Sequence, residues 1–157
     1  MICCIDPGAP PKTVFAHDCE TEGSWEHGGR VGVQRSPPVS HFDIVAAEKP
    51  TGVIRAGRTP ASVVSPAGWG MAALFACNVT ADGVRLWIPM EAWKDKAYPN
   101  GARTKKEAFC GWLVADFKLK GLDPESDSDQ DVIEAIGLFK TLAKFSRKDL
   151  NKWRVKW

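Results

Sequence analysis

Four acidic residues that lie far apart in the sequence have the residue type and the local setting of metal ligands. Asp6 and Glu48 each follow directly on an apolar run of the sequence. A carboxylate that ends a buried apolar strand costs free energy unless another group compensates its charge. Asp131 and Glu134 are three residues apart, so a helix would place both side chains on one face. Gathered together, the four carboxylates would repel one another and favour bound cations.

Clustered carboxylates point to hydrolytic chemistry. Their hard oxygen ligands select Mg²⁺, or Mn²⁺ in its place, over softer metals. Two such ions, about 4 Å apart, would activate water and stabilise the leaving oxygen during in-line attack on a phosphodiester. We therefore expect two metal ions per site and hydrolytic cleavage of a nucleic acid strand.

Each acid also has an explanation that needs no metal. Asp6 precedes a Pro-Gly pair and is a good turn former, and Glu48 is placed to pair with Lys49 at the surface. Asp131 and Glu134 in a first helical turn would stabilise the helix dipole. The metal interpretation depends on the joint pattern, because an acid at the end of a buried strand occurs twice.

Charge is unevenly distributed along the chain of 157 residues, although the net charge is only +2. Residues 123–134 hold six acidic and no basic residues. Residues 94–120 carry seven Lys or Arg against three acidic residues, and residues 140–157 carry seven against one. The basic flanks would hold phosphates beside the acids, although a solvated acidic loop explains the charge equally well.

The elements that must position the acids are predicted to form a mixed sheet with helices on its faces, an α/β fold. Strands are expected at residues 1–5, 13–16, 31–34, 42–47 and 84–89, the first three as an antiparallel meander. Helices are expected at residues 61–78, 104–119 and from an N-cap at Ser128 to about residue 145. Asp6 and Glu48 would meet at one sheet edge if their strands are parallel and adjacent.

The chain is long enough for one domain over residues 1–157, with a basic C-terminal tail from about residue 146. Five cysteines form an odd set without a CxxC pair, which favours a reducing, cytoplasmic location. No apolar run approaches the roughly 20 residues needed to cross a bilayer, so no membrane role is expected. A zinc site at His17, Cys19 and His27 is disfavoured by its irregular spacing.

Ordered motifs resemble those of the RuvC-type Holliday junction resolvases, in the ribonuclease-H-like superfamily. ICCIDPG (residues 2–8) resembles the opening strand motif, and VAAEKP (45–50) resembles the segment of the second acid. RLWIP (85–89) and DVIEAIGL (131–138) resemble the later strand and the closing helix motif. The resemblance implies a ribonuclease-H-like, mixed five-stranded sheet flanked by helices.

The resemblance also implies roles for individual residues. Asp6, Glu48, Asp131 and Glu134 would bind Mg²⁺ and act in catalysis. Lys106 in the segment GARTKKEAFCG resembles the family's catalytic lysine, with Lys105 as the fallback. The residues expected to contact DNA are Arg55 and Arg58 in the loop over residues 49–60, and Arg103, Lys105 and Lys106 farther along the chain.

The implied function is that of a magnesium-dependent endonuclease, a homodimer that cuts four-way DNA junctions in a bacterial or phage-infected cell. Two alternatives stay open: a related nuclease that acts on other branched DNA or RNA-DNA hybrid, and a junction-binding protein that does not cut. Glu134 stands where the family usually has Asp, which lengthens that ligand by one methylene. Asp127 and Asp129 lie close enough in sequence to replace Asp131 as a ligand.

Overall fold

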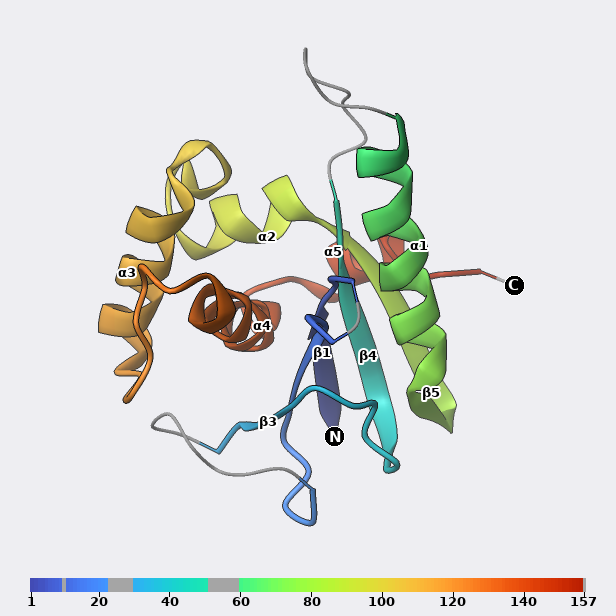
Figure 1. Ribbon diagram of the computed structural model, residues 1–157. Coiled ribbons are helices and arrows are strands. Elements are labelled where there is room, and N and C mark those ends of the chain that lie inside the picture. Colours follow the sequence, from blue (N-terminus) through green and yellow to red (C-terminus); the bar gives the residue numbers. More distant parts are fainter. Residues whose placement is uncertain (10, 23–29, 51–59, 157) are drawn as a thin grey trace.

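The computed structural model describes residues 1–9, 11–22, 30–50 and 60–156 (Figure 1). Its centre is a five-stranded sheet in the order β3-β2-β1-β4-β5. The strands are β1 (Ile2–Asp6), β2 (Val14–His17), β3 (Gly32–Gln34), β4 (His41–Lys49) and β5 (Asn78–Pro89). The mixed five-stranded sheet predicted from the sequence is confirmed.

The antiparallel meander predicted for the first three strands is confirmed, and the fourth strand meets the condition of lying parallel and adjacent to the first. β1, β2 and β3 form an antiparallel meander, and β4 lies parallel to β1. β5 lies parallel to β4 but begins six residues before the predicted start at residue 84. The difference comes from Asp82 and Gly83, which suggest a turn but lie where the β4–β5 register shifts. A Cβ at Gly83 would lie 2.8 Å from the Phe42 carbonyl oxygen, so only glycine fits this irregularity.

Helices cover both faces of the sheet (Figure 1). They are α1 (Pro60–Ala76), α2 (Met90–Ala97), η1 (Gly101–Arg103, a 3-10 helix), α3 (Lys106–Phe117), α4 (Asp127–Leu142) and α5 (Arg147–Lys152). α1 packs on one face over β1 and β4, and α4 packs on the other face over β1 and β2, with α2 and α3 beside it. α2 was not predicted. The predicted N-cap at Ser128 is wrong, because Ser126 precedes the first turn and its carbonyl accepts the Gln130 amide at 2.8 Å.

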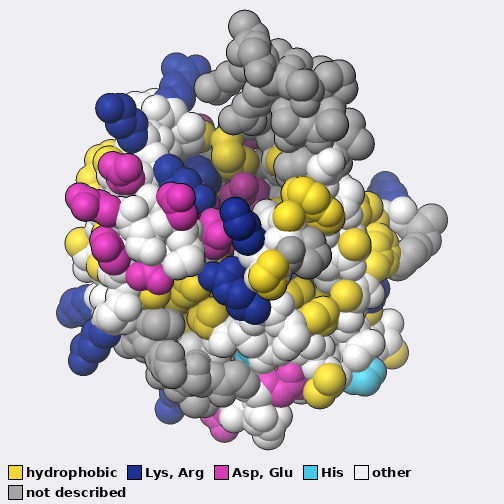
Figure 2. Space-filling view, viewed as in Figure 1, with side chains coloured by type: hydrophobic (Ala, Val, Ile, Leu, Met, Phe, Trp, Pro, Cys, Tyr) yellow, Lys and Arg dark blue, Asp and Glu magenta, His cyan; other side chains and the backbone are white. Residues whose placement is uncertain are grey.

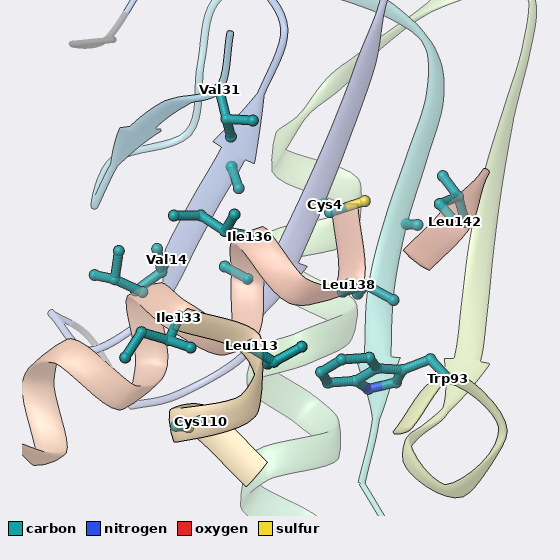
Figure 3. Packing of buried hydrophobic residues seen from close by; sticks show 14 of the residues in the cluster. Cys4, Val14, Val31, Trp93, Cys110, Leu113, Ile133, Ile136, Leu138 and Leu142 are labelled. Carbon is teal, nitrogen blue, oxygen red and sulfur yellow. The ribbon is translucent and has the colours of Figure 1, made fainter. Parts of the chain in front are cut away.

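Side chains that alternate along the strands build two cores. Cys4 and Ala46 belong to the core beneath α4, with Ile136 of that helix and Trp93 of α2 (Figure 3). The side chains of Cys3, Ile5, Val45 and Ala47 instead belong to the core beneath α1. Since alternate residues point to the same face, β1 and β4 direct their terminal acids to the α4 side. All five cysteines are buried and free.

The C-terminal segment is not a loose basic tail. After α5, the Trp87 amide donates to the Trp153 carbonyl at 2.9 Å, and the Val155 amide donates to the Arg85 carbonyl at 2.9 Å. Leu86 and Arg154 form an antiparallel bridge between these bonds. The segment therefore extends the sheet beyond β5. None of the described helices combines the length and the apolar character needed to cross a bilayer.

One buried hydroxyl offers a test of the packing. Thr141 of α4 is fully buried, and among the described residues its Oγ1 has no hydrogen-bond partner. A buried polar group without a partner keeps its desolvation penalty, so we expect Thr141→Val to raise the free energy of unfolding by about 1 kcal/mol. Thermal denaturation should show a Tm higher by roughly 2–4 °C. A lower Tm would mean that the hydroxyl is bonded in solution.

Candidate metal centre

The strand register places two of the predicted acids side by side. Ile5 pairs with Ala47 across the parallel strands β1 and β4, so Asp6 and Glu48 are the next neighbours in register. Both residues follow the alternation that points Cys4 and Ala46 toward α4. Asp6 is only 9% exposed. The C-terminal edge of the sheet therefore presents two adjacent carboxylates to the helix that crosses it.

α4 brings the other two acids to this edge. One ligand oxygen from each of Asp6, Asp131 and Glu134 lies within 4.8 Å of the other two. Glu134 is buried and Asp131 is half-buried. Asp127 and Asp129 do not belong to this group, and Asp129 instead accepts the Asp123 amide at 2.9 Å. Among the alternatives left open by the sequence, the structure therefore favours Asp131.

Glu48 lies beside the group of three but is not part of it. Its Oε2 accepts a hydrogen bond from the Trp93 indole Nε1 at 2.7 Å. Trp93 is fully buried at the start of α2, so the indole fixes the orientation of this carboxylate. The structure thus brings together three predicted ligands. It places the fourth, Glu48, close enough for its negative charge to raise the pKa of Asp6.

Two lysines reach into the cluster from different helices. The Lys106 ammonium of α3 lies 3.1 Å from Glu134 Oε2 and 3.2 Å from Asp131 Oδ1. The Lys94 ammonium of α2 forms an ion pair with Glu134 Oε1, and both partners are buried. Lys106 was expected at the site from the sequence, whereas Lys94 was not, because it lies on the unpredicted helix α2. A Cβ at Gly101 would lie 2.2 Å from the Lys94 carbonyl oxygen, so this glycine lets η1 pack against the end of α2.

The pKa values show which charges lack compensation. Burial, together with the Glu134 and Glu48 carboxylates, holds the pKa of Asp6 well above its ordinary value. Burial also raises the pKa of Glu48 to about 7, despite the opposing charge of Lys94. Burial opposes the charged form of Lys94, yet Glu48 and Glu134 outweigh it and raise the lysine's pKa. Four carboxylates and two ammonium groups leave two negative charges, and the raised pKa values lie on Asp6 and Glu48.

Basic residues surround the acids on the outer side of the site. A hollow of about 300 Å³ borders the cluster and is lined by Lys12, Lys106, Asp127 and Asp131 among others. Figure 2 shows acidic side chains gathered over α3 and α4, with Lys and Arg side chains next to them. Sequence analysis missed Lys12, whose only signal was a basic residue in the turn after β1.

The residues expected to contact DNA are only partly placed. Arg103 ends η1 and Lys105 precedes α3, and both are exposed. Lys106 belongs to the carboxylate cluster itself. Arg55 and Arg58 lie outside the described residues. DNA contact by Arg103 and Lys105 therefore remains a prediction, which their exposure allows.

The surroundings of His17 give no support to the zinc site at His17, Cys19 and His27 that the sequence already disfavoured. His17 is buried, its Nε2 lies 3.2 Å from Gln34 Oε1, and its Nδ1 accepts the Cys19 amide at 3.2 Å. Both ring nitrogens are thus engaged in holding β2 and its turn. His27 lies outside the described residues.

Comparisons of the chain with family models, with curated proteins and with solved structures found no match. A functional proposal therefore depends on the carboxylate cluster and its surroundings. The cluster offers three convergent oxygen ligands, a residual negative charge and adjacent basic groups. This combination suits a divalent cation that acts on a phosphate ester.

Proposed function

We propose that the protein is a magnesium-dependent nuclease of the RuvC-type resolvase kind, which hydrolyses DNA strands at four-way junctions as a homodimer. The observation that carries the proposal is the convergence of Asp6, Asp131 and Glu134 oxygens within 4.8 Å. The strand order, with an antiparallel meander joined to two parallel strands, supports the ribonuclease-H-like fold that the motif resemblance implies. We propose a homodimer because a four-way junction has two-fold symmetry, so two symmetry-related subunits could each place one metal site on one of two strands.

The donor set fits the proposed cofactor. Carboxylate oxygens are the ligands that Mg²⁺ and Mn²⁺ prefer, and Asp6, Asp131 and Glu134 would hold the ion. The two uncompensated charges of the cluster match the charge of one divalent cation. A second ion, as expected from the sequence, stays a prediction.

When bound, the ion would supply Lewis-acid activation of water and of the phosphodiester. The chain's own residues would hold the substrate and control protons around it. Lys106 and Lys12 lie at the mouth of the cluster, where ammonium groups attract a phosphate. Glu48, with a pKa of about 7 and one oxygen fixed by Trp93, can exchange a proton near neutral pH. The buried Lys94 would hold the Glu134 carboxylate in place through their ion pair.

One observation favours the alternative of a junction-binding protein that does not cut. The Lys94 ammonium contacts the Glu134 carboxylate, so part of the charge that a cation would balance is already balanced. In that case the cluster would be an internal ion-pair network and the surrounding basic groups alone would bind DNA. Cleavage and binding must therefore be measured separately.

The deciding experiment compares substrates and metals. Purified protein is incubated with a labelled four-way junction, a linear duplex or an RNA-DNA hybrid, each with Mg²⁺, Mn²⁺ or a chelator. We expect paired nicks in the junction that depend on the divalent ion, and little cutting of linear duplex. Preferred cutting of the hybrid would assign the site to a different nuclease. Junction binding without cutting under all metal conditions would favour the non-cleaving alternative.

The raised pKa of Glu48 predicts how stability depends on pH. The folded chain raises this pKa from its ordinary value of 4.5 to about 7, so it holds the proton more tightly than the unfolded chain does. The contribution of Glu48 to stability is therefore largest below pH 4.5 and declines as the pH rises to about 7, by at most about 3 kcal/mol. Chemical denaturation with a chelator present should show this decline.

Added Mg²⁺ should offset the decline above neutral pH and have little effect near pH 5, because protonated carboxylates are poor ligands. Glu48→Gln is the control, since it cannot lose the proton and its stability curve should be flatter over the same range. Parallel curves for the two proteins would mean that Glu48 titrates at its ordinary pKa.

A further inference from the structure

A second surface with the character of a phosphate-binding site lies away from the carboxylate cluster. Two adjoining hollows of about 550 and 300 Å³ follow β5 and the C-terminal segment, and share Arg154 and Val155 in their walls. We call them together the basic trough. It extends from Lys49 and Pro89, at the C-terminal ends of β4 and β5, to Lys156 and Val79.

The charge of the basic trough is of one sign. Its lining includes five basic residues, Lys49, Arg85, Lys152, Arg154 and Lys156. Among the described residues that line the two hollows, none is acidic. Lys152 pairs with Asp149, and Arg85 donates to the Leu74 and Cys77 carbonyls. Lys49, Arg154 and Lys156 are exposed, so a polyanion can reach them.

The floor of the basic trough is apolar and well supported. Trp87 and Trp153 are half-buried there, and Trp153 packs against Phe145 with the ring centroids 4.9 Å apart. The backbone bonds between β5 and residues 153–155 fix the main chain that carries the basic side chains of that segment. A basic groove lined with aromatic side chains is typical of surfaces that bind a nucleic acid.

The basic trough begins beside the candidate metal centre and follows the β5 edge of the sheet, with lining residues from both faces. Lys49 follows Glu48 directly, and alternation along β4 turns the two side chains to opposite faces. From Val79 to Pro89 the β5 wall spans about 30 Å, roughly the rise of nine base pairs of duplex. A strand that leaves the metal centre past the sheet edge would enter the trough.

We propose that the basic trough binds the phosphate backbone of a DNA arm other than the one whose strand is cut. The inference rests on the proposed function for its choice of DNA as the polyanion. A branched substrate has arms that diverge from the cut site, and the trough follows the β5 edge of the sheet whereas the metal centre lies at β1 and α4. Arg154 and Lys156 would contribute phosphate contacts, and Lys49 would hold the backbone where the arm enters.

The test reverses charge in the basic trough and measures binding in a chelator, where no cutting occurs. Arg154→Glu with Lys156→Glu leaves the backbone bonds of the segment intact, and circular dichroism and Tm check the fold. The matched control is Lys118→Glu with Lys120→Glu, which makes the same charge change at the end of α3, far from β5 (Figure 1). Anisotropy of a labelled four-way junction gives Kd between about 50 and 200 mM salt.

We expect the trough variant to bind the junction at least about tenfold more weakly than the control variant, with a salt slope smaller by about 2. Equal effects in the two variants would overturn the proposal, because the protein's net charge alone would then explain them. A trough variant that loses binding to phosphatidylglycerol vesicles, but keeps DNA binding, would overturn it in favour of a membrane surface.

Cleavage by the wild-type protein separates this inference from the proposed function. Junction cutting with no specific effect of the trough variant would reject the inference alone. Trough-dependent binding without any cutting would support the inference and reject the nuclease. Absence of DNA binding by the wild-type protein would reject both.

Discussion

Asp6→Asn should abolish DNA cutting while leaving junction binding intact. The substitution keeps the shape of the side chain but removes a charged oxygen from the group formed with Asp131 and Glu134. Loss of one ligand to a catalytic metal removes several kcal/mol of transition-state stabilisation, so we expect the rate to fall by about 10³-fold or more. Binding depends on the basic residues, and Kd should change little or decrease slightly.

The same substitution should make the folded protein more stable in a chelator. Burial and the neighbouring carboxylates raise the pKa of Asp6, so its charged form is unfavourable in the absence of a cation. Asp6→Asn removes that unfavourable charge, and the Tm near neutral pH should rise. Opposite effects on activity and stability are typical of a residue that is placed for function.

Asp127→Asn is the matched control for Asp6→Asn. Asp127 is exposed on the first turn of α4 and lines the hollow beside the cluster, but it is outside the group of three ligands. Its variant should cut at a rate within a few-fold of the wild type. A large loss of cutting in Asp127→Asn, with Asp6→Asn active, would contradict the assigned ligand set.

The second large effect is expected at Lys94, where Lys94→Met removes one partner of a buried ion pair. Glu134 is 4% exposed and would keep Lys106 as its only described cationic partner. Breaking a buried pair from one side typically costs about 3–5 kcal/mol. Since Lys106 remains, we expect the free energy of unfolding to fall by about 3 kcal/mol in a chelator, with partial recovery on addition of Mg²⁺.

Two further variants make the Lys94 prediction specific. Lys96→Met changes an exposed lysine of the same helix and should cost less than about 1 kcal/mol. Lys94→Met combined with Glu134→Gln removes the charge on both sides, so the double variant should be more stable than Lys94→Met alone. If the effects of Lys94→Met and Glu134→Gln on the free energy of unfolding are additive in a double-mutant cycle, the ion pair contributes nothing to stability in solution.

The partners of Glu48 illustrate what the sequence did not contain. The indole of Trp93 and the ammonium of Lys94 both come from α2, an eight-residue helix that was not predicted. A short helix leaves little periodic pattern, and its stability comes from packing against α4 and β5. Nothing local distinguishes the buried Lys94 from the exposed Lys96 two residues later.

The attachment of the basic C-terminal segment was not predicted, for a related reason. Backbone bonds to Arg85 and Trp87 attach this segment to β5. Main-chain pairing at a sheet edge does not depend on side-chain type, so composition is a poor guide to it. The apolar Trp153, packed on Phe145, was the local signal for the attachment.

The existence of the strands, and the acids at the ends of two of them, could be predicted from the residues alone. Buried strands need continuous apolar residues, and this requirement makes Asp6 and Glu48 conspicuous at the ends of such runs. The spacing of Asp131 and Glu134 likewise follows from the helical repeat. Three features of the site could be seen only in the folded chain: Asp131 joins the cluster, Glu48 accepts a hydrogen bond from Trp93, and two lysines face the four acids. These outcomes depend on how α2, α3 and α4 pack over the sheet edge, and contacts between distant segments leave no periodic signal in a single chain.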